Sequence, residues 1–197
     1  MAGYETIVSG TSPSITAVTQ LDGTPIFSAT TGGITFGVPV SGAGGYATGV
    51  RQIVSSLAGS VQTITTQIPA DTTVPQNTEG TQIASVTITP QSATSFLRID
   101  AVLSGFVVSA SVTPVAAIFR DSAVGAFAAS VNQVNSGLTG DMHFSAIVAS
   151  GSTALTTFKL RFGPNAAATI YVNGYPGPST YLGGILQTGL IVTEFNL

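Results

Sequence analysis

Apolar and polar residues alternate over several stretches in the C-terminal part of the chain. In 96–103 every second residue from Leu97 onward is apolar, and Arg98 and Asp100 occupy positions between them. Residues 142–148 and 157–162 alternate in the same way. A period of two places successive side chains on opposite faces of a strand. Each stretch is therefore predicted to be a β-strand with one face towards a core.

Turn residues separate these stretches from further strand candidates. Turn-forming residues cluster as Asn-Ser-Gly at 135–137, Gly-Pro-Asn at 163–165 and Pro-Gly-Pro at 176–178, where they favour tight turns. No long window combines a 3.6-residue apolar period with a helix cap. We therefore predict an all-β head over residues 81–197, folded as an antiparallel β-sandwich. The other predicted strands are 81–89, 115–120, 126–134, 169–173 and 189–195.

Residues 1–60 differ from the predicted head in composition. The first 50 are rich in glycine, threonine and serine, with isolated apolar pairs, and the glycines of 42–49 predict a flexible joint. Residues 51–68 are predicted to be either a stalk strand or a short helix. We do not expect 1–60 to bury a core alone. We expect an extended attachment or stem segment that folds against a partner chain, followed by a linker over 61–80.

One uncharged stretch, Ala101–Phe119, has the length of a membrane span. Gly105 and Pro114 interrupt it, and its valine content is high. Two strands joined by a turn near Thr113 and Pro114 account for it better, so no membrane insertion is expected. The start of the chain lacks the basic and apolar regions of a secretory signal.

Only 7% of the residues are charged, against about 25% in an ordinary soluble domain. The net charge is −3 and the five cationic residues are scattered, so nucleic-acid binding, which depends on phosphate neutralisation, is not expected. We expect Arg98 with Asp100, and Arg120 with Asp121, to form local or intersubunit charge pairs. Catalysis draws on titratable side chains, so this composition favours a structural or binding protein over an enzyme.

The candidates for chemistry are few, because the chain has one histidine and no cysteine. Alternation places His143 on the outward face of its strand, and no G-x-S-x-G motif supplies a nucleophile for a Ser-His-Asp site. Asp121 and Asp141 could belong to a calcium site, but no calcium-loop motif accompanies them. The glycines of 42–47 lack the flanking strand and helix of a dinucleotide site. We predict no catalytic residue, no cofactor and no metal.

Three tyrosines surround a loop rich in glycine and proline, residues 173–181. Tyr171 precedes the loop, and Tyr175 and Tyr181 belong to it. Tyrosines on a rigid loop can form a sugar- or protein-binding surface. They can equally pack at a subunit interface. Both interpretations stay open, and we take Asn173, Tyr175 and Tyr181 as the candidate contact surface.

The chain carries, in this order, the segments Val74–Gly80, Ile88–Ile99, Ala117–Asp121, Ser152–Gly163, Tyr171–Gly174, Leu182–Gly184 and Leu190–Phe195. Their order and spacing resemble the C-terminal β-sandwich module of tailed-bacteriophage fibres and other virion appendages. The resemblance implies an antiparallel sandwich of the jelly-roll type that forms a homotrimer and has no enzymatic activity. It transfers no binding residue, because the outer loops vary within the family.

A mean hydropathy of +0.47 agrees with a trimer whose flat faces bury apolar side chains between subunits. We expect a structural protein of a tailed-phage virion, assembled in the host cytoplasm. It is either a short tail fibre or spike whose head contacts a host-surface receptor, or a capsid decoration protein. The N-terminal segment would bind another virion protein, of the tail or the capsid, through Ile7, Phe27 and Phe36. The rival classes are a polysaccharide-cleaving enzyme and a cellular adhesin.

Overall fold

A computed structural model of the chain describes residues 5–8, 15–19, 25–30, 33–35, 49–177 and 179–196. The chain divides into two compact units, Met1–Ala47 and Thr48–Leu197. Four short strands of the first unit form an antiparallel sheet in chain order. They are β1 (Glu5–Val8), β2 (Ile15–Thr19), β3 (Pro25–Thr30) and β4 (Gly33–Thr35).

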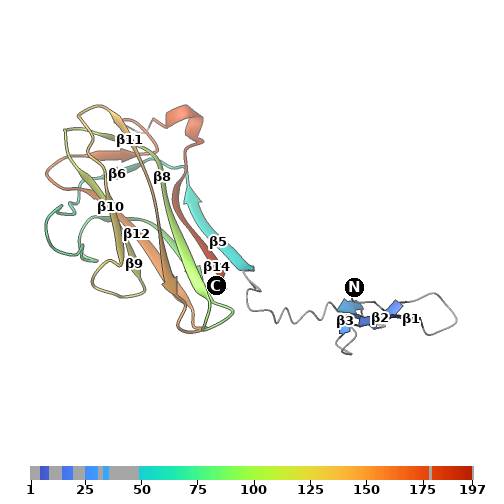
Figure 1. Cartoon of the computed structure of the whole chain (residues 1–197). Helices are drawn as coiled ribbons and strands as arrows, with labels where there is room; N and C mark the ends of the chain where they lie inside the picture. The colour runs from blue at the N-terminus through green and yellow to red at the C-terminus, as the bar shows by residue number, and fades with distance from the viewer. Residues whose placement is uncertain are drawn as a thin grey trace. The chain divides into compact units, whose positions relative to one another are not determined.

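The second unit, which we call the head, is an all-β sandwich of two antiparallel sheets (Figure 1). The small sheet has the order β10-β9-β12-β7, and the large sheet holds the other six strands. Strands of the small sheet are β7 (Thr81–Ile88), β9 (Pro114–Arg120), β10 (Ala128–Val131) and β12 (Thr156–Pro164). Strands of the large sheet are β5 (Val50–Ala58), β6 (Gln62–Ile64), β8 (Phe96–Val108), β11 (Thr139–Ala149), β13 (Ile170–Val172) and β14 (Thr188–Phe195).

The 13-residue strand β8 organises the large sheet. β11 pairs along one side of it, while β14 and then β13 pair along the other side. β5 continues the sheet beyond β14, and β6 continues it beyond β13. Two strand pairs therefore lie end to end across the sheet, and the chain between β13 and β14 leaves the sheet and returns to it.

The core between the sheets consists of the residues that the alternation predicts. Leu97, Ile99 and Leu103 of β8 are fully buried, as are Phe158, Leu160 and Phe162 of β12. Phe106 meets Phe162 edge to face, with ring centroids 5.0 Å apart. Burial of one such side chain stabilises the fold by about 1.5–3 kcal/mol. The prediction of an antiparallel β-sandwich is confirmed.

The membrane-length stretch 101–119 consists of the end of β8, a turn and most of β9, as predicted. Neither strand is long enough alone to hold it, and the turn falls between Val108 and Pro114. The described helix is the short 3-10 helix η1 (Tyr181–Gly184). None of the helices in the described part of the chain is long and apolar enough to cross a membrane.

The start of the head lies earlier than the expected residue 81. β5 and β6 belong to the large sheet, although both fall in the expected stem and linker. Residues 65–80 are not a free linker either, because they pack against the head. Ile68 is fully buried, and its N–H donates to the Pro164 carbonyl. The largest aliphatic side chains of β5, Ile53 and Leu57, lie on its outer face. A search for inward-facing apolar rows therefore does not identify this strand.

Candidate functional site

The middle of the outer face of the small sheet, at β9 and β12, is covered by the chain itself, whereas Ala129 and Val131 of β10 are exposed on the same face. On this face β9 presents Val115, Ala117 and Phe119, all of them buried although they lie outside the central core. They are paired across the sheet with Gly163, Arg161 and Lys159 of β12. We call this the covered face.

Residues 65–80 form the cover. Arg161 donates from Nε to the Glu79 carbonyl at 2.6 Å and from Nη2 to the Gly80 carbonyl at 2.7 Å. A side chain on Gly163 would meet the backbone of Thr66 and Ile68, so the cover rests directly on β12. Desolvation by burial lowers the pKa of Arg161. The guanidinium therefore holds a loop against the sheet and is not free for a ligand.

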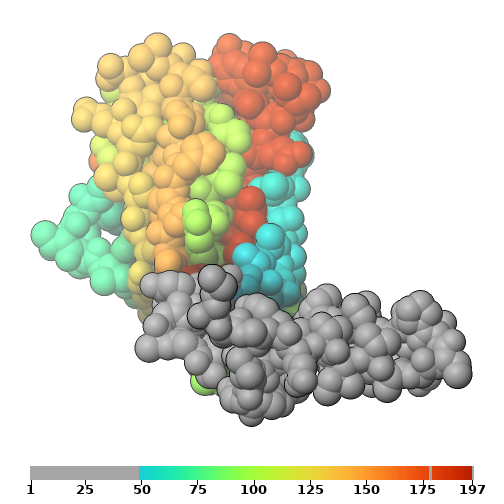
Figure 2. Space-filling view, turned by 45° about the vertical axis from the view of Figure 1, so that its right-hand side comes forward, coloured from blue at the N-terminus to red at the C-terminus, as the bar shows by residue number. Residues whose placement is uncertain are grey.

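Among the described residues of the head, none forms a comparable cover over the outer face of the large sheet. The strands β5, β14, β8 and β11 pair in this order, and their registers align side chains in three rows across this outer face. In Figure 2 these strands lie side by side on the surface, coloured cyan, red, green and orange. The rows are Ile53–Thr193–Arg98–Ile147, Ser55–Ile191–Asp100–Ser145 and Leu57–Gly189–Val102–His143. We call these twelve residues the open face.

Two large apolar side chains on the open face are more than half exposed. Ile53 is 62% exposed and Ile147 is 58% exposed. The two formal charges in the three rows neutralise each other, because Arg98 Nε lies 2.9 Å from Asp100 Oδ1. Ser145 Oγ also donates to that carboxylate. An apolar, hydroxyl-rich surface without net charge is suited to burial against another protein surface.

The excursion between β13 and β14, residues 174–187, projects beyond one end of the open face. It carries η1, in which Leu182 has a left-handed backbone (φ 46°) that costs a leucine energy. Leu182 and Ile185 are both exposed. Ser104 N–H donates to the Gln187 carbonyl, and Leu186 lies against Gly105, so the excursion returns over the end of β8.

Asn173 fixes the base of the excursion. Its Nδ2 donates to the Ala58 carbonyl at 2.9 Å and to the Ser60 carbonyl at 3.3 Å, where the chain passes from β5 to β6. Its Oδ1 accepts from the Thr188 hydroxyl at 2.9 Å. Asn173 is buried and has a left-handed backbone (φ 59°), which asparagine tolerates better than most residues. The prediction that Asn173 forms part of a contact surface is therefore wrong: its amide is needed inside the head to satisfy the carbonyls of the strand break.

Tyr175 and Tyr181, the other two residues of the candidate contact surface, lie against each other. Their ring centroids are 3.8 Å apart, and the Tyr181 hydroxyl lies 3.0 Å from the hydroxyl of Thr139. Tyr175 is 46% exposed. Its pKa is raised, first through its hydrogen bond with Tyr181 and then through desolvation, so the phenol stays neutral in ordinary buffers.

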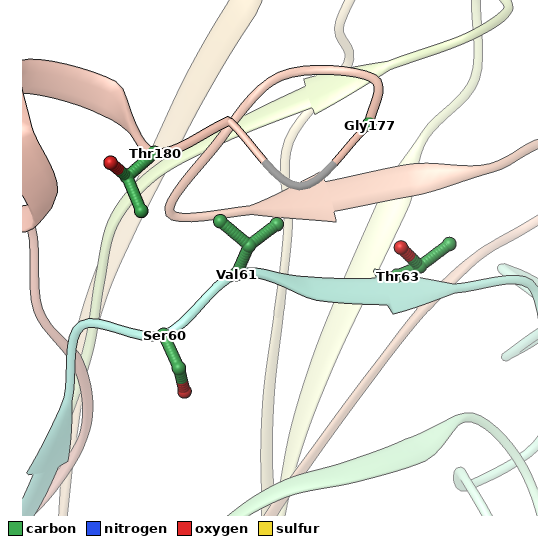
Figure 3. Close-up of a pocket in the computed structure, with 5 residues that line it drawn as sticks. All are labelled: Ser60, Val61, Thr63, Gly177 and Thr180. Carbon is green, nitrogen blue, oxygen red and sulfur yellow. The ribbon is translucent and has the colours of Figure 1, made fainter.

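A groove of about 560 Å³ opens beside the excursion (Figure 3). It lies between the start of β6 and the loop that follows Gly174. Val61 points from the β6 side towards the loop, with Gly177 and Thr180 across from it. The lining residues are Ser60, Val61, Thr63, Gly177 and Thr180.

The other predicted site residues fall in several elements. Ile7 lies in β1 and Phe27 in β3, and Phe36 lies outside the described residues. His143 is exposed and paired with Val102, on the outward face as predicted. Asp121 Oδ1 accepts from the Thr157 N–H at 2.8 Å, which gives this carboxylate a role in a turn.

The two expected charge pairs are present as local pairs, Arg98 with Asp100 and Arg120 with Asp121 at 3.7 Å. Among the described residues, no three histidine, aspartate or glutamate side chains stand close enough together to hold a metal ion.

Two features escaped the sequence prediction. The exposed aliphatic residues of β5 alternate visibly in 53–57, but alternation does not tell which face looks inward. Glu194 falls in the inward register of β14, with Leu190 and Val192, and such a buried acid needs several hydrogen-bond donors. That position in the alternation is the signal that could have identified it.

No protein-family model matches the sequence, and no curated protein matches it. Among solved structures, the chain is similar to one in "Structure of infectious bursal disease virus Gx strain", with a TM-score of 0.36 and 12% identity. The similarity covers 74% of this chain and 36% of that chain, so the chain spans about a third of the other's length.

Proposed function

We propose that the chain is a non-enzymatic structural protein on the virion surface of a tailed phage, a trimeric short tail fibre or spike. Three heads of the jelly-roll type pack through their open faces. The N-terminal unit attaches to another virion protein, and the excursion end of each head meets a host-surface receptor.

The observation that carries this proposal is the contrast between the two outer faces of the head. The chain covers the middle of one face with its own residues 65–80 and leaves Ile53 and Ile147 exposed on the other. Copies of the chain suit the open face, because its single ion pair is satisfied internally and presents no net charge to a partner. Removal of such apolar surface from water favours association by about 25 cal/mol per Å² before the entropic cost of binding is subtracted. The resemblance to fibre modules supports three copies per assembly.

Capsid decoration is the second candidate. The N-terminal residues form a compact unit of their own with a four-stranded sheet. A small separate unit can dock on a capsid lattice as well as on a tail protein, and either location leaves the head free to trimerise.

Immunogold labelling of intact virions with an antibody against residues 74–197 tests the proposal and separates its two forms. Gold at the tail tip indicates a fibre or spike, and gold spread over the capsid indicates decoration. Purified virions that carry no label, alongside a labelled positive control of the recombinant protein, would contradict the virion assignment.

The attachment role of the N-terminal unit has its own test. Phe27→Ser together with Phe36→Ser should release the protein from virions, because apolar anchors lose most of their binding energy when they become polar. The head should still associate, since its open face is unchanged. Normal incorporation of this variant, measured by immunoblotting of purified particles, would contradict the assignment of the anchor.

A further inference from the structure

We propose that the groove between β6 and the excursion binds an uncharged carbohydrate, with room for one or two sugar units. This inference deepens the proposed receptor-contacting role of the head and rests on it. The volume of about 560 Å³ falls within the range of small-molecule sites, about 300–1,000 Å³. One valine, one glycine and three residues with hydroxyl groups line it.

Backbone hydrogen bonds close the loop that forms one side of the groove. Tyr175 N–H donates to the Ser179 carbonyl at 3.0 Å, and Tyr181 N–H donates to the Asn173 carbonyl at 3.1 Å. Gly174 has no room for a side chain, because a Cβ there would lie 2.6 Å from a methyl of Val61 and 2.5 Å from the Ser179 carbonyl. Val61 is thus pressed against the base of the loop. A preformed site loses little conformational entropy on binding.

The chemistry of the lining selects an uncharged polar ligand. None of the five lining residues can ionise, so a phosphate, sulfate or carboxylate group would enter without a counter-charge. A purely apolar ligand would strip water from the hydroxyls of Thr63 and Thr180 without replacing their hydrogen bonds. A neutral sugar satisfies both requirements, since it presents hydroxyls at its edge and C–H groups on its faces.

The tyrosine pair adds a flat aromatic surface on the same loop. Tyr175 is two residues before Gly177 and is half-exposed, and its ring is kept in place by Tyr181 and, through it, by Thr139. Because the Tyr175 phenol stays neutral, it adds no charge to the site. A rigid amphipathic ring provides contact area at a low entropic cost.

An array of neutral, sialylated and sulfated oligosaccharides, probed with the full chain, tests the class of ligand. The expected result is binding to neutral glycans, with no gain from sulfate or sialic acid. Binding to none of them, or to sulfated or sialylated glycans alone, would overturn the inference.

Isosteric variants test the location. Thr63→Val and Thr180→Val keep the shape of the groove but remove one hydroxyl each, and each should weaken binding of the best array glycan roughly tenfold. Thr87→Val is the matched control, because Thr87 is exposed on β7 of the small sheet. Affinities that are equal in all three variants, measured by titration of the amide NMR signals of the full chain, would place any glycan site elsewhere.

Failure of this inference is distinguishable from failure of the proposed function. Groove variants with altered affinity should leave virion labelling and the mass of the assembly unchanged, since Thr63 and Thr180 lie outside the open face. If the glycan binds but the virions carry no label, the carbohydrate site stands and the virion assignment falls.

Discussion

On the covered face, the outer side chains of β9 are as buried as those that face the core, whereas on the open face Ile53 and Ile147 are more than half exposed. Both faces lie on antiparallel strands and mix apolar side chains with polar and charged ones. The difference lies in what the chain places over them: residues 65–80 wrap the small sheet and are bonded to Arg161 and Pro164. In the first case apolar side chains contribute to the stability of one head, and in the second we propose that they contact another copy of the chain.

The largest change in stability is expected from the covered face. Phe119→Ala should lower the free energy of unfolding by about 3–5 kcal/mol, because it leaves a cavity under the cover. Val131→Ala, at an exposed position of β10 in the same sheet, should change it by less than about 0.5 kcal/mol. Urea unfolding followed by circular dichroism, at one protein concentration, measures both. Equal small effects would mean that the cover does not seal this face.

A smaller loss of stability is expected from substitution of Glu194, near the C-terminal end of β14. Its carboxylate is buried and accepts hydrogen bonds from Gln52 Nε2, the Gln91 and Ser92 N–H groups and Ser95 Oγ. Burial alone raises the pKa of Glu194, but these hydrogen bonds outweigh it and the pKa is lowered from 4.5. Glu194→Gln should cost about 1–3 kcal/mol at pH 7, since an amide cannot accept from all these donors.

The pH dependence of that loss follows from the lowered pKa. The stability that Glu194 contributes is complete above pH 4.5, its unfolded value, and is lost as the pH falls through the lower pKa of the folded state. The difference between wild type and Glu194→Gln should therefore shrink on acidification below pH 4.5. A constant difference down to the pH of acid unfolding would show that the pKa of Glu194 is not lowered in the folded head.

The smallest effect on the single head is expected from the open face. Ile53→Ala should change the free energy of unfolding by less than about 0.5 kcal/mol in dilute solution, where the chain is not associated. At higher concentration the same change should lower the apparent stability, because association stabilises the folded state by mass action. A loss of several kcal/mol in dilute protein would mean that Ile53 is already covered within one chain.

Much of this fold follows from local patterns in the sequence. The alternation in 96–103 and 157–162 identifies the strands and their inward residues, and the glycine and proline clusters identify the turns between them. The uncharged stretch 101–119 resolves into two strands for the same reason. These features depend on neighbours in the chain, so the sequence displays them directly.

The features that escaped prediction depend on segments far apart in the chain. Asn173 precedes a glycine and resembles an exposed turn residue, yet its amide reaches carbonyls 113 and 115 residues away. Arg161 holds a loop that lies about 80 residues earlier. β5 carries its largest aliphatic residues, Ile53 and Leu57, on the outer face, so its pattern does not show which face looks towards the core. Contacts between residues so far apart in the chain become visible only in the three-dimensional structure.

The mass of the assembly tests the central claim most directly, that the open face joins copies of the chain. Sedimentation equilibrium of the full chain should give about three times 19.8 kDa, and Ile147→Asp should reduce it to a single chain. Val131→Asp is the matched control, because Val131 is 59% exposed, like Ile147, but lies on the small sheet; its mass should equal that of wild type. A wild-type mass of 19.8 kDa, or dissociation by Val131→Asp and not by Ile147→Asp, would contradict the account.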